Sequence, residues 1–148
     1  MAARQFCTFT LAQHFFGIPV EEVQEVIRST ETTRVPLAHP AVRGLINLRG
    51  QILLTIDLRR RLELDALDVQ MSPVHLVLRT VDGAVALLVD AMGDVLDVDD
   101  DWFEKSPETL NPRIRKLILG AYKLENRLLL VLNTANTVNL ASESESSK

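Results

Sequence analysis

Residue types that build reactive and metal sites are scarce in this chain. Its 148 residues include one cysteine, Cys7, and three histidines, His14, His39 and His75. A single cysteine cannot form an internal disulfide or a cysteine-rich zinc site. The histidines lie far apart, without the spacing of a metal site or of a catalytic pair. We therefore expect no bound metal and a reducing compartment.

Long apolar runs are also missing. The longest cover residues 84–89 and 128–132, well short of the ~18 residues that a membrane span needs. The N-terminus lacks an apolar core followed by small residues, so we expect no signal peptide. Together with the single cysteine, these absences predict a cytoplasmic protein that does not insert into the membrane.

Patterns that indicate catalysis or nucleic-acid binding are absent as well. The six glycines occur singly, so no glycine-rich phosphate loop is present. Most serines lie in the C-terminal tail and none sits in a Gly-x-Ser-x-Gly motif. The net charge of −4 argues against phosphate binding, and the one basic cluster, residues 59–61, is more typical of a solvated helix face. We expect no enzyme activity, no catalytic residue, no cofactor and no nucleic-acid partner.

One acidic stretch resembles a calcium loop in part. Asp97, Asp99 and Asp101 occupy its first, third and fifth places, and Glu108 occupies the twelfth. However, Trp102 stands where that loop needs glycine for its sharp turn. The pattern therefore favours a solvated loop that caps a short helix beginning near Trp102.

Strand-like segments dominate the rest of the chain. Short turns join four expected hairpins, namely residues 6–11 with 15–20, 45–48 with 52–58, 74–78 with 84–89, and 123–124 with 127–132. The pair Asp82-Gly83 is a strong hairpin signal. Short helices are expected at residues 58–64 and 112–118. Strands this closely spaced indicate small barrels or a sandwich.

The chain also contains an internal repeat. Residues 16–26 agree in chemical type with residues 85–95, and residues 44–58 agree with residues 120–134. The same two blocks recur in the same order, which indicates two copies of one small β unit; chance similarity of apolar strands is the alternative. Neither copy would bury much core alone. A groove between two packed copies is then the natural place for a ligand or partner.

Residues 42–59 carry the most specific pattern, a hairpin with one glycine at its entry and another at its turn. They resemble the signature of the CheW family, the coupling proteins of bacterial chemosensory arrays. The matching motifs are Arg43-Gly44, Asn47-Leu48-Arg49-Gly50 and Asp57-Leu58-Arg59. The resemblance covers about residues 5–140, with departures at Thr55, where the family often has proline, and at Asn133, where aspartate is common.

The resemblance implies a mainly all-β fold. It consists of two SH3-like five-stranded β-barrel subdomains packed around a shared hydrophobic core, with a few short helices. We expect a single CheW-like domain over residues 5–140 and a disordered polar tail over 141–148. Lobe 1 would span about residues 16–73 and lobe 2 about residues 74–135, with the N-terminal strand a candidate to cross over into lobe 2.

The resemblance also implies a non-catalytic adaptor. Such a protein joins the cytoplasmic tip of methyl-accepting chemotaxis receptors to the regulatory domain of the histidine kinase CheA, and is held at membrane receptor arrays through protein contacts. A coupling protein of a twitching-type pathway and a small-molecule-binding double barrel remain alternatives. An enzyme would need a perturbed titratable cluster, which the sequence does not offer.

The receptor-binding positions implied by the family lie along a groove between the lobes. They are Val23, Glu25, Gly44, Arg49, Ile52 and Val74. The three branched side chains would form an apolar floor for a receptor helix, and the two charged residues would form its rim. The alternative is that Glu25 and Arg49 bond only to each other.

A kinase-binding surface is expected next to this groove, at Val26, Ile27 and Arg28. These residues follow the motif in which Val23 and Glu25 lie. The alternative is that Val26 and Ile27 simply fill the core.

Overall fold

The structure is a computed structural model that describes residues 3–28, 31–64, 73–105 and 108–140. Its elements, in chain order, are β1 (Ala3–Leu11), β2 (His14–Pro19), the 3-10 turn η1 (Val20–Glu22), β3 (Val23–Ile27), β4 (Val42–Leu48), β5 (Gln51–Asp57), α1 (Leu58–Arg61), β6 (Val74–Thr80), β7 (Gly83–Val89), β8 (Ala91–Asp99), the 3-10 turn η2 (Asp100–Trp102), β9 (Phe103–Glu104), α2 (Pro112–Arg115), β10 (Ile118–Lys123), β11 (Leu128–Leu132) and α3 (Thr134–Val138). The tail predicted over residues 141–148 lies outside the described residues. The described part of the chain has no helix long and apolar enough to cross a membrane.

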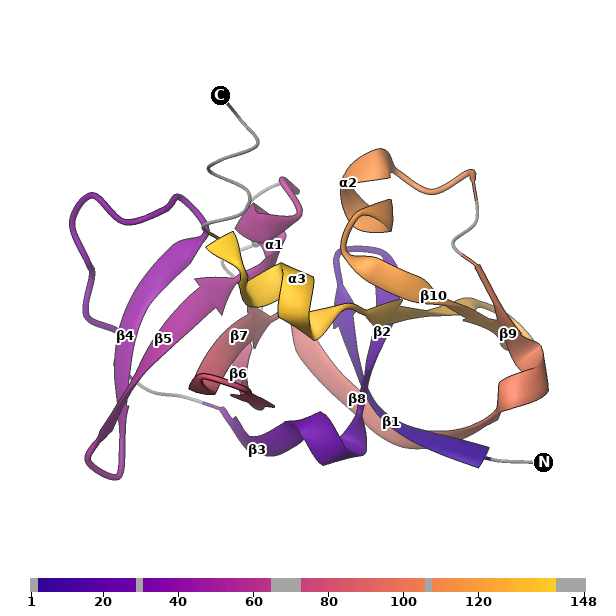
Figure 1. Ribbon diagram of the computed structural model, residues 1–148, viewed down its shortest axis with the longest axis horizontal. Coiled ribbons are helices and arrows are strands. Elements are labelled where there is room, and N and C mark those ends of the chain that lie inside the picture. The colour runs from indigo at the N-terminus through magenta and orange to yellow at the C-terminus, as the bar shows by residue number, and fades with distance from the viewer. Residues whose placement is uncertain (1–2, 29–30, 65–72, 106–107, 141–148) are drawn as a thin grey trace.

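The strands form two sheets, which lie on either side of α3 in Figure 1. The five-stranded sheet has the order β3-β6-β7-β5-β4, and we call it lobe 1. The six-stranded sheet has the order β8-β1-β2-β11-β10-β9, and we call it lobe 2; its sixth strand, β9, has only two residues. The fold class predicted from the sequence, two small barrels with few short helices, is confirmed.

The repeat found in the sequence corresponds to an exchange of hairpins between the lobes. The hairpin β1–β2 sits between β8 and β11 in lobe 2, and the hairpin β6–β7 sits between β3 and β5 in lobe 1. Both insertions create one parallel pair, β2 with β11 and β7 with β5. Each half of the sequence therefore supplies the central hairpin of the other half's sheet.

The division expected near residue 73 does not separate these lobes. The structure places β2 in lobe 2, although the sequence predicts that it starts lobe 1, and places β6 and β7 in lobe 1 rather than lobe 2. The cause is local, because the chain changes sheet directly after each inserted hairpin. Pro19 and the turn η1 redirect it from β2 to β3, and Asp90 lies between β7 and β8.

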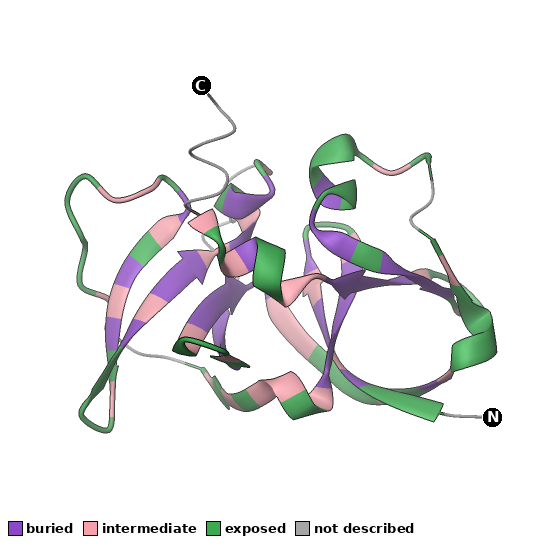
Figure 2. Cartoon of the chain, in the orientation of Figure 1, coloured by how far each residue is buried: buried purple, intermediate pink, exposed green. Residues whose placement is uncertain are grey.

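Three apolar clusters fill the molecule, and Figure 2 shows the buried residues concentrated in the strands. The largest draws on both lobes, with Phe9, Phe16 and Leu130 from one and Ile56 and Leu76 from the other. One smaller cluster fills the interior of lobe 2 and another fills the interior of lobe 1. Burying apolar surface stabilises a fold by about 25 cal/mol per Å². The shared cluster is therefore the main link between the lobes.

Polar contacts add to that link around the arginine triplet. Only Arg60 of the three has an exposed side chain, 53%. Arg59 and Asp90 form a buried ion pair, while Arg61 is 7% exposed and donates to the carbonyl of Thr137 in α3 at 2.8 Å. The expectation of a solvated helix face is therefore wrong for two of the three arginines.

The acidic stretch does not form a calcium loop. Asp97 and Asp99 lie within β8, where they pair with β1 in extended conformation. The Asp99 carboxylate accepts from the Asp101 backbone N–H at 2.9 Å and so caps η2. In the ranges that the structure describes, no three acidic, histidine or cysteine side chains are placed to hold a metal ion.

Candidate functional site

An ion pair between Glu25 on β3 and Arg49 in the β4–β5 turn is the centre of the candidate site. Arg49 Nη1 lies 2.7 Å from Glu25 Oε2, and Nη2 lies 2.8 Å from Oε1. The two parallel hydrogen bonds form the fork geometry that fixes a guanidinium against a carboxylate. Because β3 and β4 are the two edge strands of the sheet in lobe 1, this pair joins opposite ends of the sheet.

The backbone of the turn sets the direction of the arginine. Leu48 pairs with Gln51, so the turn has two residues, Arg49 with φ 52° and Gly50 with φ 89°. Positive φ at both positions defines the hairpin turn whose twist matches that of the strands. Glycine adopts this conformation easily and arginine rarely does. The side chain of Asn47 supports the turn by accepting from the Gly50 N–H at 2.9 Å.

The pair is charged and faces solvent. The side chain of Arg49 is 72% exposed and that of Glu25 is 23% exposed. The hydrogen bonds from Arg49 lower the pKa of Glu25 below its ordinary value, and the same bonds raise the pKa of Arg49. Both groups are therefore ionised at neutral pH. Arg49 has five N–H donors, of which this pair engages two, and its exposed side chain leaves the others open to solvent.

Glu25 and Arg49 bond to each other in the free protein, as one of the two alternatives from the sequence predicted. This bond does not exclude a partner, since the outer donors of Arg49 remain available. Ile52, three residues after Arg49, adds an apolar surface beside the turn and is 58% exposed. Val23, two residues before Glu25 on β3, is half-buried and packs against the shared core.

Gly44 and Val74 lie away from this surface. Val74 is 3% exposed within the shared core, so its side chain offers no floor for a helix in this conformation. Gly44 has φ 151°, and a Cβ there would lie 2.3 Å from the Thr33 carbonyl oxygen. Thr33 pairs with Leu45 on β4. Gly44 is therefore needed for the close approach of the residue 31–40 segment to β4.

The three kinase-binding candidates divide between the two faces of β3. Val26 is 39% exposed and lies on the outer face, and Arg28, the residue directly after β3, is exposed too. Ile27 is half-buried and packs against the interior cluster of lobe 1. Part of the expected surface is thus open, and the alternative of core packing applies to Ile27 alone.

The interior of lobe 1 contains polar groups without partners. His75 Nε2 and Thr55 Oγ1 are buried and make no hydrogen bond with any residue the structure describes. Burial, with a smaller contribution from nearby Arg43, lowers the pKa of His75. The ring is therefore neutral at pH 7. The hydroxyl of Thr55 stands at the position where the resemblance leads one to expect proline.

Sequence reasoning missed the network around Asp90. Arg59 donates to its carboxylate through Nε at 2.7 Å and Nη2 at 2.5 Å, and the Ala12 backbone N–H donates at 2.8 Å. These bonds connect α1, the β7–β8 junction and the β1–β2 turn. A signal was present, because Asp90 and Arg59 both end motifs that match the family, but nothing in one sequence pairs them.

Comparison with known proteins gives consistent matches along nearly the whole chain. The family model of the CheW-like domain matches residues 5–142. A probable chemotaxis protein CheW of Rhizobium etli is 30% identical over 143 residues, which cover 97% of this chain and 90% of the relative. The chemotaxis protein CheW of Bacillus subtilis is 34% identical over 123 residues, which cover 83% of this chain and 78% of the relative.

A solved structure has the same fold. The scaffolding protein TtCheW from Thermoanaerobacter tengcongensis matches with a TM-score of 0.79 over 88% of this chain and 89% of its own. Its sequence is 23% identical, so this likeness bears on the fold alone. The two-barrel architecture is therefore one that a solved protein adopts.

Proposed function

The chain belongs to the CheW-like domain family, and from this membership we propose that it is a non-catalytic adaptor that couples methyl-accepting chemoreceptors to the histidine kinase CheA in a bacterial chemosensory array. The observation that carries the proposal is the exposed Glu25–Arg49 pair, held at the tip of the motif by which the family is recognised. The protein acts in the cytoplasm, at the receptor array, through protein contacts.

The receptor surface consists of Glu25, Arg49 and Ile52, with Val23 at its edge. A receptor helix would place apolar side chains on Ile52 and a polar group against the outer donors of Arg49. The pair with Glu25 holds the guanidinium in place before binding, which lowers the entropic cost of ordering it. Gly44 and Val74 lie outside this exposed surface, because Val74 is in the shared core and Gly44 admits the backbone of Thr33 beside β4.

The kinase surface consists of Val26 on the outer face of β3 and Arg28 directly after the strand, with Ile27 anchoring β3 from inside. The outer and inner faces of one strand alternate, so Glu25 and Val26 point in different directions. The regulatory domain of CheA and the receptor tip can therefore contact neighbouring residues of β3 without competing for the same side chains.

Two variants test both surfaces in one experiment, by titrating the full chain against a purified receptor-tip fragment and against the CheA regulatory domain. Arg49→Ala should weaken receptor binding about tenfold or more and leave kinase binding unchanged, as for a central interface arginine. Arg28→Glu should do the reverse. Both residues are exposed, so both variants should melt within a degree or two of the wild type.

Each variant serves as the control for the other. If folded Arg49→Ala bound the receptor fragment as tightly as the wild type does, the receptor contact would not lie at the turn. If either variant weakened the binding of both partners equally, the receptor surface and the kinase surface would not be distinct.

A further inference from the structure

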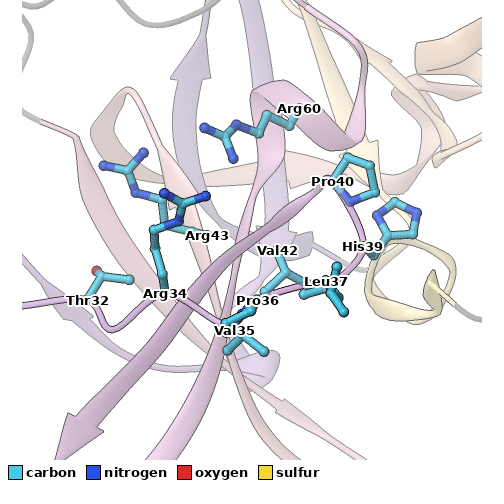
Figure 3. A pocket seen from close by; sticks show the side chains of 11 residues that line it. Thr32, Arg34, Val35, Pro36, Leu37, His39, Pro40, Val42, Arg43 and Arg60 are labelled. Carbon is cyan, nitrogen blue, oxygen red and sulfur yellow. The ribbon is translucent and has the colours of Figure 1, made fainter.

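A cavity of about 550 Å³ lies on lobe 1, where the segment from Thr32 to Pro40 passes beside the start of β4 and α1. Its volume falls in the range of ~300–1,000 Å³ typical of ligand sites. Arg34, Arg43 and Arg60 line it, and their guanidinium groups point toward a common region (Figure 3). The described lining residues include no aspartate or glutamate.

Among the described residues, few counter-charges lie against these guanidinium groups. Arg34 and Arg43 form no hydrogen bond or ion pair with another residue in the described ranges. Arg60 Nε lies 3.6 Å from Asp57 Oδ2, a loose contact on an exposed side chain. In a chain whose net charge is −4, so many guanidinium groups around one cavity favour an anionic ligand.

A further donor lies at the end of the cavity. His39 accepts the Ala41 backbone N–H at its Nδ1, at 3.0 Å. Because Nδ1 accepts this bond, a ring proton lies on Nε2, which is a hydrogen-bond donor. The polar side chains that line the cavity, three arginines, His39 and Thr32, can all donate hydrogen bonds, as a carboxylate or phosphate requires.

The rim is apolar and strained. Leu37 is fully exposed and has φ 62°. It is the third residue of a turn closed by the Ala38 N–H and the Val35 carbonyl at 3.4 Å, a position that usually holds glycine or asparagine after Pro36. Val35 beside it is 36% exposed. Strained backbone of this kind clusters at active sites and ligand clamps.

We propose that this cavity binds an acidic peptide segment of a partner protein, in which glutamate or aspartate lies close to leucine-like residues. The carboxylates would take the fork donors of Arg34 and Arg43, and the apolar side chains would cover Leu37 and Val35. A nucleotide fits less well, because no phenylalanine, tyrosine or tryptophan is among the described lining residues to stack a base. None of the residues of the Glu25–Arg49 surface lines the cavity, so this site can be tested independently.

The probe is a synthetic, acetylated ten-residue peptide of alternating Glu-Glu and Leu-Leu pairs, labelled with fluorescein, titrated with the full chain by fluorescence anisotropy. Binding should be measurable at low salt and should weaken at least fivefold when the salt concentration is raised tenfold, because the contact is between charges. A peptide in which every glutamate is replaced by glutamine should bind at least tenfold more weakly.

Variants locate the site. Arg34→Gln and Arg43→Gln should each weaken peptide binding about fivefold or more, and Leu37→Asn should weaken it without loss of stability, because asparagine tolerates positive φ. The matched control is Arg115→Gln, which removes another exposed arginine, one that does not line the cavity. This control should bind as the wild type does.

Four results would overturn the proposal. Equal binding of the glutamate and glutamine peptides would exclude carboxylate recognition. If Arg115→Gln weakened peptide binding as much as Arg43→Gln does, the effect would come from the total charge of the protein and not from the cavity. Shifts of the amide resonances of Arg34 and Arg43 by inorganic phosphate, without binding of the peptide, would make the cavity a small-anion site. Self-association that depends on Arg43, again without peptide binding, would make the occupant a second copy of this chain.

Discussion

Gly44 shows how far a single residue could be understood from the sequence. The motif Arg43-Gly44 carried the resemblance, and the receptor groove was the role that the resemblance implied. The structure instead shows the backbone of Thr33 where a Cβ would stand. The contact joins β4 to a segment more than ten residues upstream, and no pattern in the sequence indicates which backbone will approach a glycine. The importance of the residue could be predicted, whereas the reason could not.

Arg49 shows the opposite case. Its place at the turn was predicted from Gly50 and the flanking apolar strands, and its bond to Glu25 was one of two alternatives drawn from the sequence. The structure shows that bond. What remained hidden was the backbone, because φ of 52° at an arginine follows from the two-residue length of the turn and not from the residue itself.

His75 should make the stability of the protein depend on pH. Its buried ring, 6% exposed, has a pKa below the ordinary 6.5, mainly because burial disfavours the charged form. In the unfolded chain the ring regains its ordinary pKa. As the pH falls below about 6.5, the unfolded state therefore binds a proton that the folded state does not, and the free energy of unfolding decreases until the pH reaches the folded pKa.

Urea unfolding at pH 7.5 and at pH 5.5 tests this dependence. The wild type should lose stability between the two values, and His75→Gln should lose less. Titration of the imidazole resonances should give His75 a pKa lower in the folded protein than in urea. An equal or higher value in the folded state would contradict the assignment.

At the scale of elements, the hairpins were predictable and their partners were not. Alternating apolar residues on either side of short turns located β1–β2, β4–β5 and β6–β7 to within a few residues. The sheet in which each hairpin lies depends on contacts between distant segments, such as the parallel pair of β5 with β7. A sequence repeat is compatible both with two separate barrels and with the exchanged arrangement, so the boundary near residue 73 followed the repeat and missed the exchange.

The buried contact of α1 with the β7–β8 junction should be a main support of this arrangement. Asp90 is 3% exposed and accepts from Arg59 and from the Ala12 backbone. Asp90→Ala would leave a buried guanidinium without its carboxylate, which costs about 3 kcal/mol of unfolding free energy. Urea denaturation measures the loss.

The exposed Asp97 on β8 provides the matched control. Asp97→Ala removes the same group from the surface and should change the unfolding free energy by less than about 0.5 kcal/mol. A loss in Asp90→Ala as small as in this control would show that the Arg59–Asp90 pair contributes little to the fold.

At the scale of the whole molecule, the exchange of hairpins makes the two halves of the sequence depend on each other. Residues 1–72 contain β1–β2 but neither β8 nor β11, the two strands between which this hairpin lies. Residues 73–148 contain β6–β7 but neither β3 nor β5. Each half alone would leave both edges of a hairpin unpaired and half of the shared core exposed to water.

We therefore expect the fragments 1–72 and 73–148 to lack a cooperative unfolding transition when each is alone. Mixed in equal amounts, they should form a one-to-one complex with the circular dichroism spectrum of the intact chain, because each completes the other's sheet. Its melting temperature should rise with fragment concentration, since folding is then coupled to association. Two barrels built from consecutive halves would behave differently, with each fragment folding by itself and the mixture equal to the sum of its parts. The intact chain, by the same reasoning, should unfold in one transition, as lobes that share their strands have no separate stability to lose.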